Sequence, residues 1–96
     1  MAINIVKDYI EELKCAMSQC YELDPVGSVY YTQLSYSEMA ASDILELLKK
    51  NRTVPPIWII EEYKNHMDKY MYMNSAGSYM FSVFHDAAEY IIDSLC

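Results

Sequence analysis

Basic residues are scarce in this sequence, with seven lysines and arginines against fourteen aspartates and glutamates and a formal net charge of -7. Proteins that bind DNA or RNA directly neutralise phosphates with basic side chains, so this balance argues against direct nucleic-acid recognition. Glycine is also rare, with two residues, and no tandem strand pattern occurs. The sequence therefore argues against a β-sheet protein.

Long hydrophobic runs are absent as well. The longest uncharged apolar run, residues 54–60, contains two prolines, and a membrane-spanning helix needs about twenty residues. Residues 1–8 lack the basic start and apolar stretch of a secretory signal. The odd set Cys15, Cys20 and Cys96 does not resemble a disulfide framework. We expect reduced thiols and a cytoplasmic protein with no membrane association.

Apolar residues are plentiful, at 53% of the chain. Average globular chains contain about 45–50%, so this content argues against intrinsic disorder. Ninety-six residues leave no room for a second hydrophobic core. We therefore expect a single domain over residues 1–96.

Apolar spacing predicts a first helix over residues 3–23. Ile3, Val6, Ile10, Leu13, Met17 and Cys20 recur at intervals of three and four. Asp24 and Pro25 end this pattern, because the residue before a proline avoids helical angles. Residues 24–35 are rich in β-branched and aromatic types, and we expect an ordered loop there.

Two start signals predict the following helices. Ser35 and Glu38 have the spacing of a capping box, which would begin a helix over 36–50. Pro56 suits the first position of a third helix, over 56–73. A short turn then precedes a fourth helix over 77–95. The expected fold is all-α, a small antiparallel bundle of four helices.

Two pairs of residues four apart are the candidate metal ligands, Glu62 with His66 and His85 with Glu89. A hairpin centred near residues 75 and 76 would bring the pairs to similar heights, as in bundles that bind metals. Ordinary surface pairing explains the same spacing, and we favour it. With two histidines and no glycine-rich elbow or phosphate loop, we expect no enzyme activity and no cofactor.

Tyrosine and methionine are abundant, with ten and seven residues, and several lie on both sides of the last turn. Such side chains are enriched where one protein binds another. The alternative is that they plug one end of the bundle. For a partner or homodimer surface, the predicted contact residues are Tyr70, Tyr72, Met73 and Tyr79.

Acidic helix faces have two interpretations. A negative surface can simply keep a small protein soluble. Alternatively, its carboxylates imitate phosphates and occupy the basic channel of a nucleic-acid-handling protein. The residues considered for this role are Asp8, Glu11, Glu12, Glu61, Glu62 and Asp68, of which the last three join the predicted contact set.

The last third of the chain contains the strings Met67-Asp68-Lys69-Tyr70, Ser78-Tyr79-Met80-Phe81-Ser82-Val83 and Ile91-Ile92-Asp93-Ser94-Leu95. In these it resembles short uncharacterised proteins of phages and mobile elements of gut bacteria. The resemblance implies a protein that blocks a host defence protein, as anti-CRISPR factors do. The alternative is a homo-oligomer that binds a small metabolite or nucleotide, although Lys49, Lys50 and Arg52 form the only local cation cluster.

Overall fold

The structure is a computed structural model and describes residues 1–20, 26–73 and 75–95. These residues form α1 (Ala2–Ser18), α2 (Val26–Lys50), α3 (Pro56–Met73) and α4 (Ser78–Leu95). A single 3₁₀ turn, Ser75–Gly77, precedes α4. No strand occurs among the described residues. The predicted all-α bundle of four helices is confirmed.

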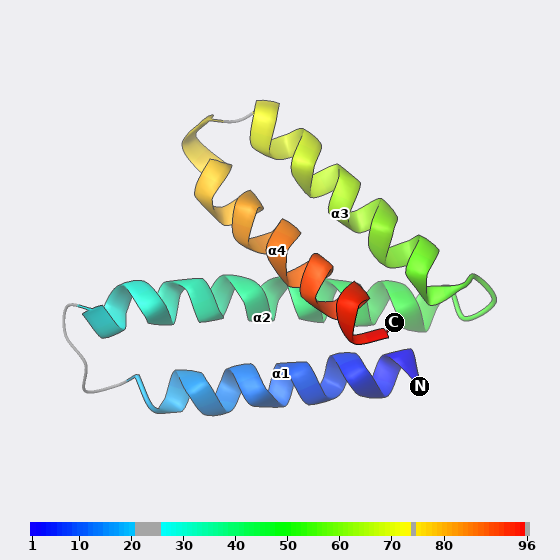
Figure 1. Cartoon of the computed structure of the whole chain (residues 1–96), viewed down its shortest axis with the longest axis horizontal. Helices are drawn as coiled ribbons and strands as arrows, with labels where there is room; N and C mark the ends of the chain where they lie inside the picture. The colour runs from blue at the N-terminus through cyan, green and yellow to red at the C-terminus, as the bar shows by residue number, and fades with distance from the viewer. Residues whose placement is uncertain (21–25, 74, 96) are drawn as a thin grey trace.

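The four helices form two antiparallel hairpins (Figure 1). Helices α1 and α2 lie side by side, and the hairpin of α3 and α4 lies at an angle across α2. The two chain ends lie at the same end of the molecule, which measures 44 × 31 × 21 Å. Because α3 and α4 diverge from α2, the turn between them projects away from the first hairpin.

One fully buried side chain from each helix marks the centre of the core. These are Val6, Ile44, Ile60 and Ile91. Burial of each such side chain contributes about 1.5–3 kcal/mol. Four alanines of α2 and α4 are buried beside them, Ala40, Ala41, Ala87 and Ala88. Small side chains at these positions leave room for the helices to approach closely.

The prediction of a loop over residues 24–35 is wrong for residues 26–35, which the structure describes. Residues 26–35 belong to α2, so Ser35 and Glu38 lie inside a helix and form no capping box. Residues 24 and 25 lie outside the described part. Leu34 is buried against Leu13 and Cys20 of the first hairpin. Burial of this face against α1 outweighs the weak helix propensity of the β-branched and aromatic residues.

The predicted helix ends agree with the structure more closely elsewhere. Helix α3 begins at Pro56, as expected from a proline ring in the first turn, and ends at Met73. Helix α4 begins at Ser78, one residue after the predicted start. Helix α1 ends at Ser18, short of the predicted residue 23; residues 21–23 lie outside the described part.

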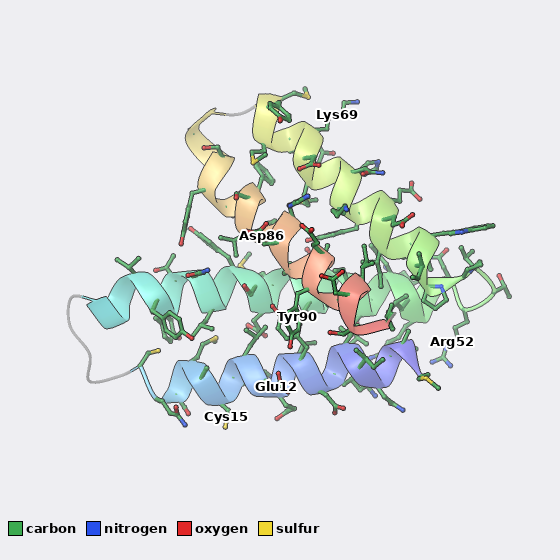
Figure 2. All side chains as sticks on the ribbon, viewed as in Figure 1. Glu12, Cys15, Arg52, Lys69, Asp86 and Tyr90 are labelled. Carbon is green, nitrogen blue, oxygen red and sulfur yellow. The ribbon has the colours of Figure 1, made fainter. Side chains whose placement is uncertain are left out.

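Tyr9 of α1 and Tyr90 of α4 join the first and last helices. Their ring centroids lie 4.6 Å apart, within the range in which aromatic pairs attract. Figure 2 shows Tyr90 on the part of α4 that crosses the first hairpin. Burial raises the pKa of the Tyr9 hydroxyl, although a hydrogen bond with Ser37 acts in the opposite direction.

Cys15 is exposed and Cys20 is buried, and both are free thiols. The Cys20 thiol donates a hydrogen bond to the carbonyl oxygen of Ala16. Cys96 lies outside the described residues. None of the described helices combines the length and apolar character needed to cross a membrane.

Candidate functional site

The free end of the α3–α4 hairpin exposes a set of large side chains. Tyr72 is 86% exposed and Met73 71%, while Tyr70 and Tyr79 are 44% and 52% exposed. We call these four residues the hairpin-end cluster. The interior next to them is filled instead by Met67, Met80 and Phe81, which pack against the core. The hairpin-end cluster is therefore largely a surface in this fold.

Ring contacts hold part of the hairpin-end cluster in place. Tyr79 contacts Tyr36 of α2 at 6.1 Å, and Tyr36 in turn contacts the buried ring of Phe84 at 6.1 Å. Tyr70 lies 5.6 Å from Phe81, whose ring is 6.0 Å from Phe84. These centroid distances and tilted arrangements are favourable for aromatic pairs. Both chains of contacts end at the buried ring of Phe84, so Tyr70 and Tyr79 are held in place before any partner binds. This limits the side-chain entropy that they would lose on binding.

His85 carries the densest group of charged contacts among the described residues. Its Nε2 atom lies 3.5 Å from Oδ1 of Asp68 on α3. Its Nδ1 atom lies 3.2 Å from Oδ1 of Asp86 and 3.9 Å from Oε2 of Glu89. The imidazole thus joins α3 to α4 and has a carboxylate near each ring nitrogen.

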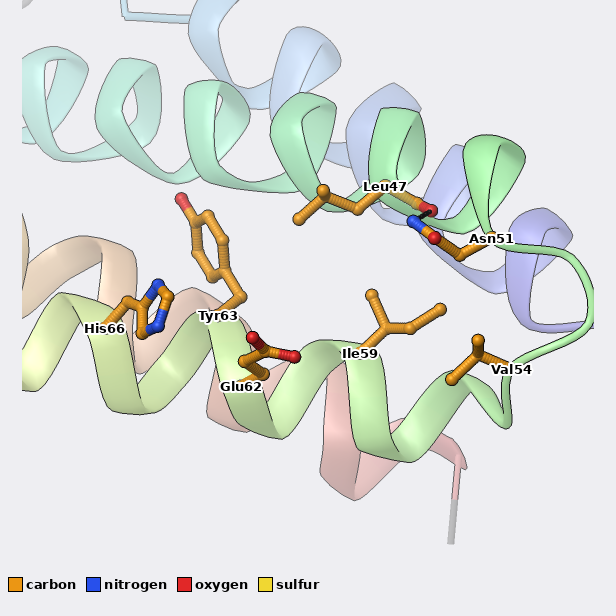
Figure 3. A pocket seen from close by; sticks show the side chains of 7 residues that line it. All are labelled: Leu47, Asn51, Val54, Ile59, Glu62, Tyr63 and His66. Carbon is orange, nitrogen blue, oxygen red and sulfur yellow. Dashed lines mark hydrogen bonds between the residues drawn. The ribbon is translucent and has the colours of Figure 1, made fainter.

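The four candidate metal ligands do not form one site. His85 and Glu89 lie together with Asp86, with one ligand atom of each within 4.8 Å of the others. Glu62 and His66 instead line a pocket between α2 and α3 (Figure 3). The hairpin does bring the two predicted pairs to similar heights, as the contact between Asp68 of α3 and His85 of α4 indicates. His66, however, lies on the side of α3 that faces α2. The group around His85 is a set of contacts between one partly buried imidazole and three carboxylates that water reaches, an arrangement common on helix surfaces.

Asp86 and its contact with His85 were not anticipated from the sequence. Neighbouring positions on a helix point about 100° apart, so spacing rules do not pair them. The only available signal was an aspartate directly following the histidine. The contact forms because the partly buried imidazole lies along α4 between the two helices, within reach of both carboxylates.

The predicted acidic contact residues lie on different sides of the molecule. Glu61 and Glu62 are exposed, and Glu62 belongs to the α2–α3 pocket. Asp68 is partly buried and faces α4. The acidic residues of α1, Asp8, Glu11 and Glu12, are exposed on the other hairpin.

Helix α4 provides a further acidic surface. Residues 78–95 contain no lysine or arginine. Three carboxylates of this helix are exposed, those of Asp86, Glu89 and Asp93, and Figure 2 marks Asp86 midway along it. These carboxylates lie from the middle of α4 to its far end, whereas the charged side chains nearest the hairpin-end cluster along α3 are Asp68 and the exposed Lys69.

The pocket between α2 and α3 has a volume of about 350 Å³. Its lining residues are Leu47, Asn51, Val54, Ile59, Glu62, Tyr63 and His66. Burial raises the pKa of Tyr63 above its ordinary value of 10.0, with a smaller contribution from Asp43. Among the described residues, the buried Tyr63 hydroxyl has no hydrogen-bond partner.

A second exposed apolar set lies at the start of α2, where a loop was expected. It consists of Val29, Tyr30 and Tyr31. Trp58, near the start of α3, is also exposed, at the opposite end of that helix from the hairpin-end cluster. These residues provide comparison sites for tests of the cluster.

Comparison of the chain with protein-family models, curated proteins and solved structures found no match.

Proposed function

We propose that this protein acts without catalysis, by binding another protein through the hairpin-end cluster. The observation that carries the proposal is the exposure of Tyr72 and Met73 beside two anchored tyrosines. Tyrosine and methionine are enriched in protein interfaces, where a few rigid aromatic side chains provide most of the binding energy. A small helical hairpin that ends in such side chains can insert into a groove of a partner.

Carboxylates one and two helical turns from the cluster favour a basic partner, against the single opposing charge of Lys69 beside Tyr70. Asp68 lies one helical turn before Tyr72, and Asp86 lies two turns after Tyr79. A basic surface would gain from this arrangement both faster association and correct orientation. We propose a nucleic-acid-handling defence protein as the partner, with the carboxylates in the place of phosphates.

The resemblance of the last third of the chain to phage and mobile-element proteins supports the same partner class. An inhibitor of this kind would act in the cytoplasm of a bacterial host, where the defence protein meets nucleic acid. Blocking requires only tight binding, so the absence of a recognisable catalytic set in the sequence agrees with the proposal.

Affinity capture from a bacterial host extract tests the proposal. The baits are the wild-type chain, the Tyr72→Ala/Met73→Ala variant and the control Trp58→Ala, which removes an exposed ring elsewhere on α3. We expect the wild type and the control to retain a defence or nucleic-acid-handling protein that the double variant loses. Recovery of no such protein by the wild type contradicts the proposal. So does turnover of a substrate by the purified chain.

Solution mass measurement separates a partner surface from a homodimer. A monomer at micromolar concentration leaves the hairpin-end cluster free for another protein. A dimer that Tyr72→Ala/Met73→Ala dissociates would show that a second copy of the chain occupies the cluster instead.

A further inference from the structure

The α2–α3 pocket lies on a different part of the molecule from the hairpin-end cluster. Its residues come from the last turn of α2, the connection after it and the part of α3 between Ile59 and His66 (Figure 3). Its volume of about 350 Å³ lies at the lower end of the range for small-molecule sites, about 300–1,000 Å³.

The polar groups of the pocket are the Glu62 carboxylate, the Asn51 amide, the Tyr63 hydroxyl and the His66 imidazole. Glu62 contributes the one carboxylate. Asn51 donates one N–H of Nδ2 to the carbonyl oxygen of Leu47 at 2.9 Å, so its Oδ1 atom and its second N–H remain for a ligand. Among the described residues that line the pocket there is no lysine or arginine. His66 is the one lining side chain that can carry a positive charge, so an anionic ligand would meet the Glu62 carboxylate with no permanent cation to offset it.

The remaining walls are apolar and aromatic. Leu47, Ile59 and Val54 line the pocket to one side of the Glu62 carboxylate in Figure 3, and the ring of Tyr63 lies between the two helices. A carboxylate beside an aromatic ring and aliphatic side chains matches an ammonium group with an apolar body, because the charge pairs with the carboxylate and the ring attracts cations. Glu62 and His66 alone offer two ligand atoms, fewer than a protein-bound transition metal takes.

We propose that the α2–α3 pocket binds a small organic ammonium ion, with its charge against Glu62 and its apolar part against Leu47, Val54 and Ile59. The pocket selects against nucleotides and carboxylate metabolites by charge. This site does not depend on the proposed partner, because none of its lining residues belongs to the hairpin-end cluster.

Nuclear magnetic resonance of the full ¹⁵N-labelled chain tests the proposal with three probes of similar shape. Phenethylammonium carries the positive charge, 2-phenylethanol is neutral, and 3-phenylpropionate is negative. For phenethylammonium we expect a dissociation constant on the order of millimolar, typical of a ligand with few atoms. Amide shifts should concentrate at the lining residues, and the other two probes should bind at least about tenfold more weakly.

Two matched variants isolate the carboxylate. Glu62→Gln removes the charge in the pocket, whereas Glu61→Gln makes the same change at an exposed neighbour outside it. We expect about tenfold weaker phenethylammonium binding for Glu62→Gln and less than about twofold for Glu61→Gln. Circular dichroism confirms that both variants fold. Equal binding of the three probes, equal effects of the two variants, or no shifts at about 10 mM phenethylammonium would overturn the proposal.

Discussion

The Nε2 atom of His85 on α4 lies 3.5 Å from Oδ1 of Asp68 on α3. This contact is the cross-helix member of the group around His85, because Asp86 and Glu89 lie on the same helix as the imidazole. It lies between the exposed hairpin end and the buried centre of the hairpin. The contact between Asp68 and His85 therefore holds α3 and α4 together between the proposed contact surface and the core.

A double-mutant cycle measures this connection. We expect Asp68→Asn and His85→Gln to show a coupling of about 0.2–1 kcal/mol, the range of partly exposed ion pairs. Solvent ions screen such a pair, so the coupling should fall at about 1 M salt. Urea denaturation of the four proteins gives the value. Asp68→Asn with Asp93→Asn, an exposed carboxylate of α4 outside the group around His85, is the control cycle, and coupling as large there would contradict a direct cross-helix pair.

Truncation of the exposed hairpin end should hardly change stability. For Tyr72→Ala/Met73→Ala we expect a change in the free energy of unfolding within about 0.5 kcal/mol per substitution, as at other exposed positions. Phe84→Ala, which removes a buried ring of the core, should cost about 3–5 kcal/mol. Denaturation curves of the two variants test this. A loss for the double variant as large as for Phe84→Ala would show that these side chains plug the bundle.

Ser35→Ala distinguishes a helix start at Ser35 from a helix that continues through it. Loss of an N-terminal cap costs about 1 kcal/mol. Inside α2 the same substitution should leave stability unchanged or raise it by up to about 0.5 kcal/mol, because alanine is the better helix former. Thermal unfolding measures the difference. Leu34→Ala should destabilise the protein by about 2–5 kcal/mol, since Leu34 packs against α1; stability equal to wild type there would contradict the extended helix.

High pH should destabilise the protein in part through Tyr63. Burial favours the neutral phenol, so its pKa in the folded chain lies above the ordinary 10.0. The contribution of the neutral Tyr63 phenol to the free energy of unfolding is therefore fully present below about pH 10. It is lost as the pH rises from there through the pKa of Tyr63 in the folded chain. Tyr63→Phe should therefore lose less stability than the wild type between about pH 8 and about pH 11. Urea midpoints measure this, and Tyr72→Phe, at an exposed ring, is the control.

At neutral pH, Tyr63→Phe should be as stable as the wild type or more so. The Asp43 carboxylate acts on the hydroxyl through its charge, but the atomic geometry forms no hydrogen bond to the hydroxyl among the described residues, so its removal breaks no bond. A loss above about 1 kcal/mol would indicate a hydrogen bond that this arrangement lacks.

Local sequence signals were sufficient to predict a helix start where a residue type typical of the first helical turn occurs there. Pro56 marked the first turn of α3, and the spacing of apolar residues in the first helix predicted the buried Val6, Ile10 and Leu13 of α1. For α2 the same proline rule was available in Asp24 and Pro25, a capping residue type followed by a proline. The β-branched and aromatic residues after them favoured a loop instead, because propensity does not include the burial of Leu34.

The sequence by itself determined that this chain forms four helices around one core, because apolar residues at intervals of three and four can be buried together only on helix faces. It also placed the candidate pairs at matching heights in the last hairpin. Only the tertiary structure decided which side of α3 each residue occupies, so that Asp68 meets His85 while Glu62 and His66 face α2. The angle at which the second hairpin crosses α2 sets these faces, and it arises from packing between helices far apart in the chain.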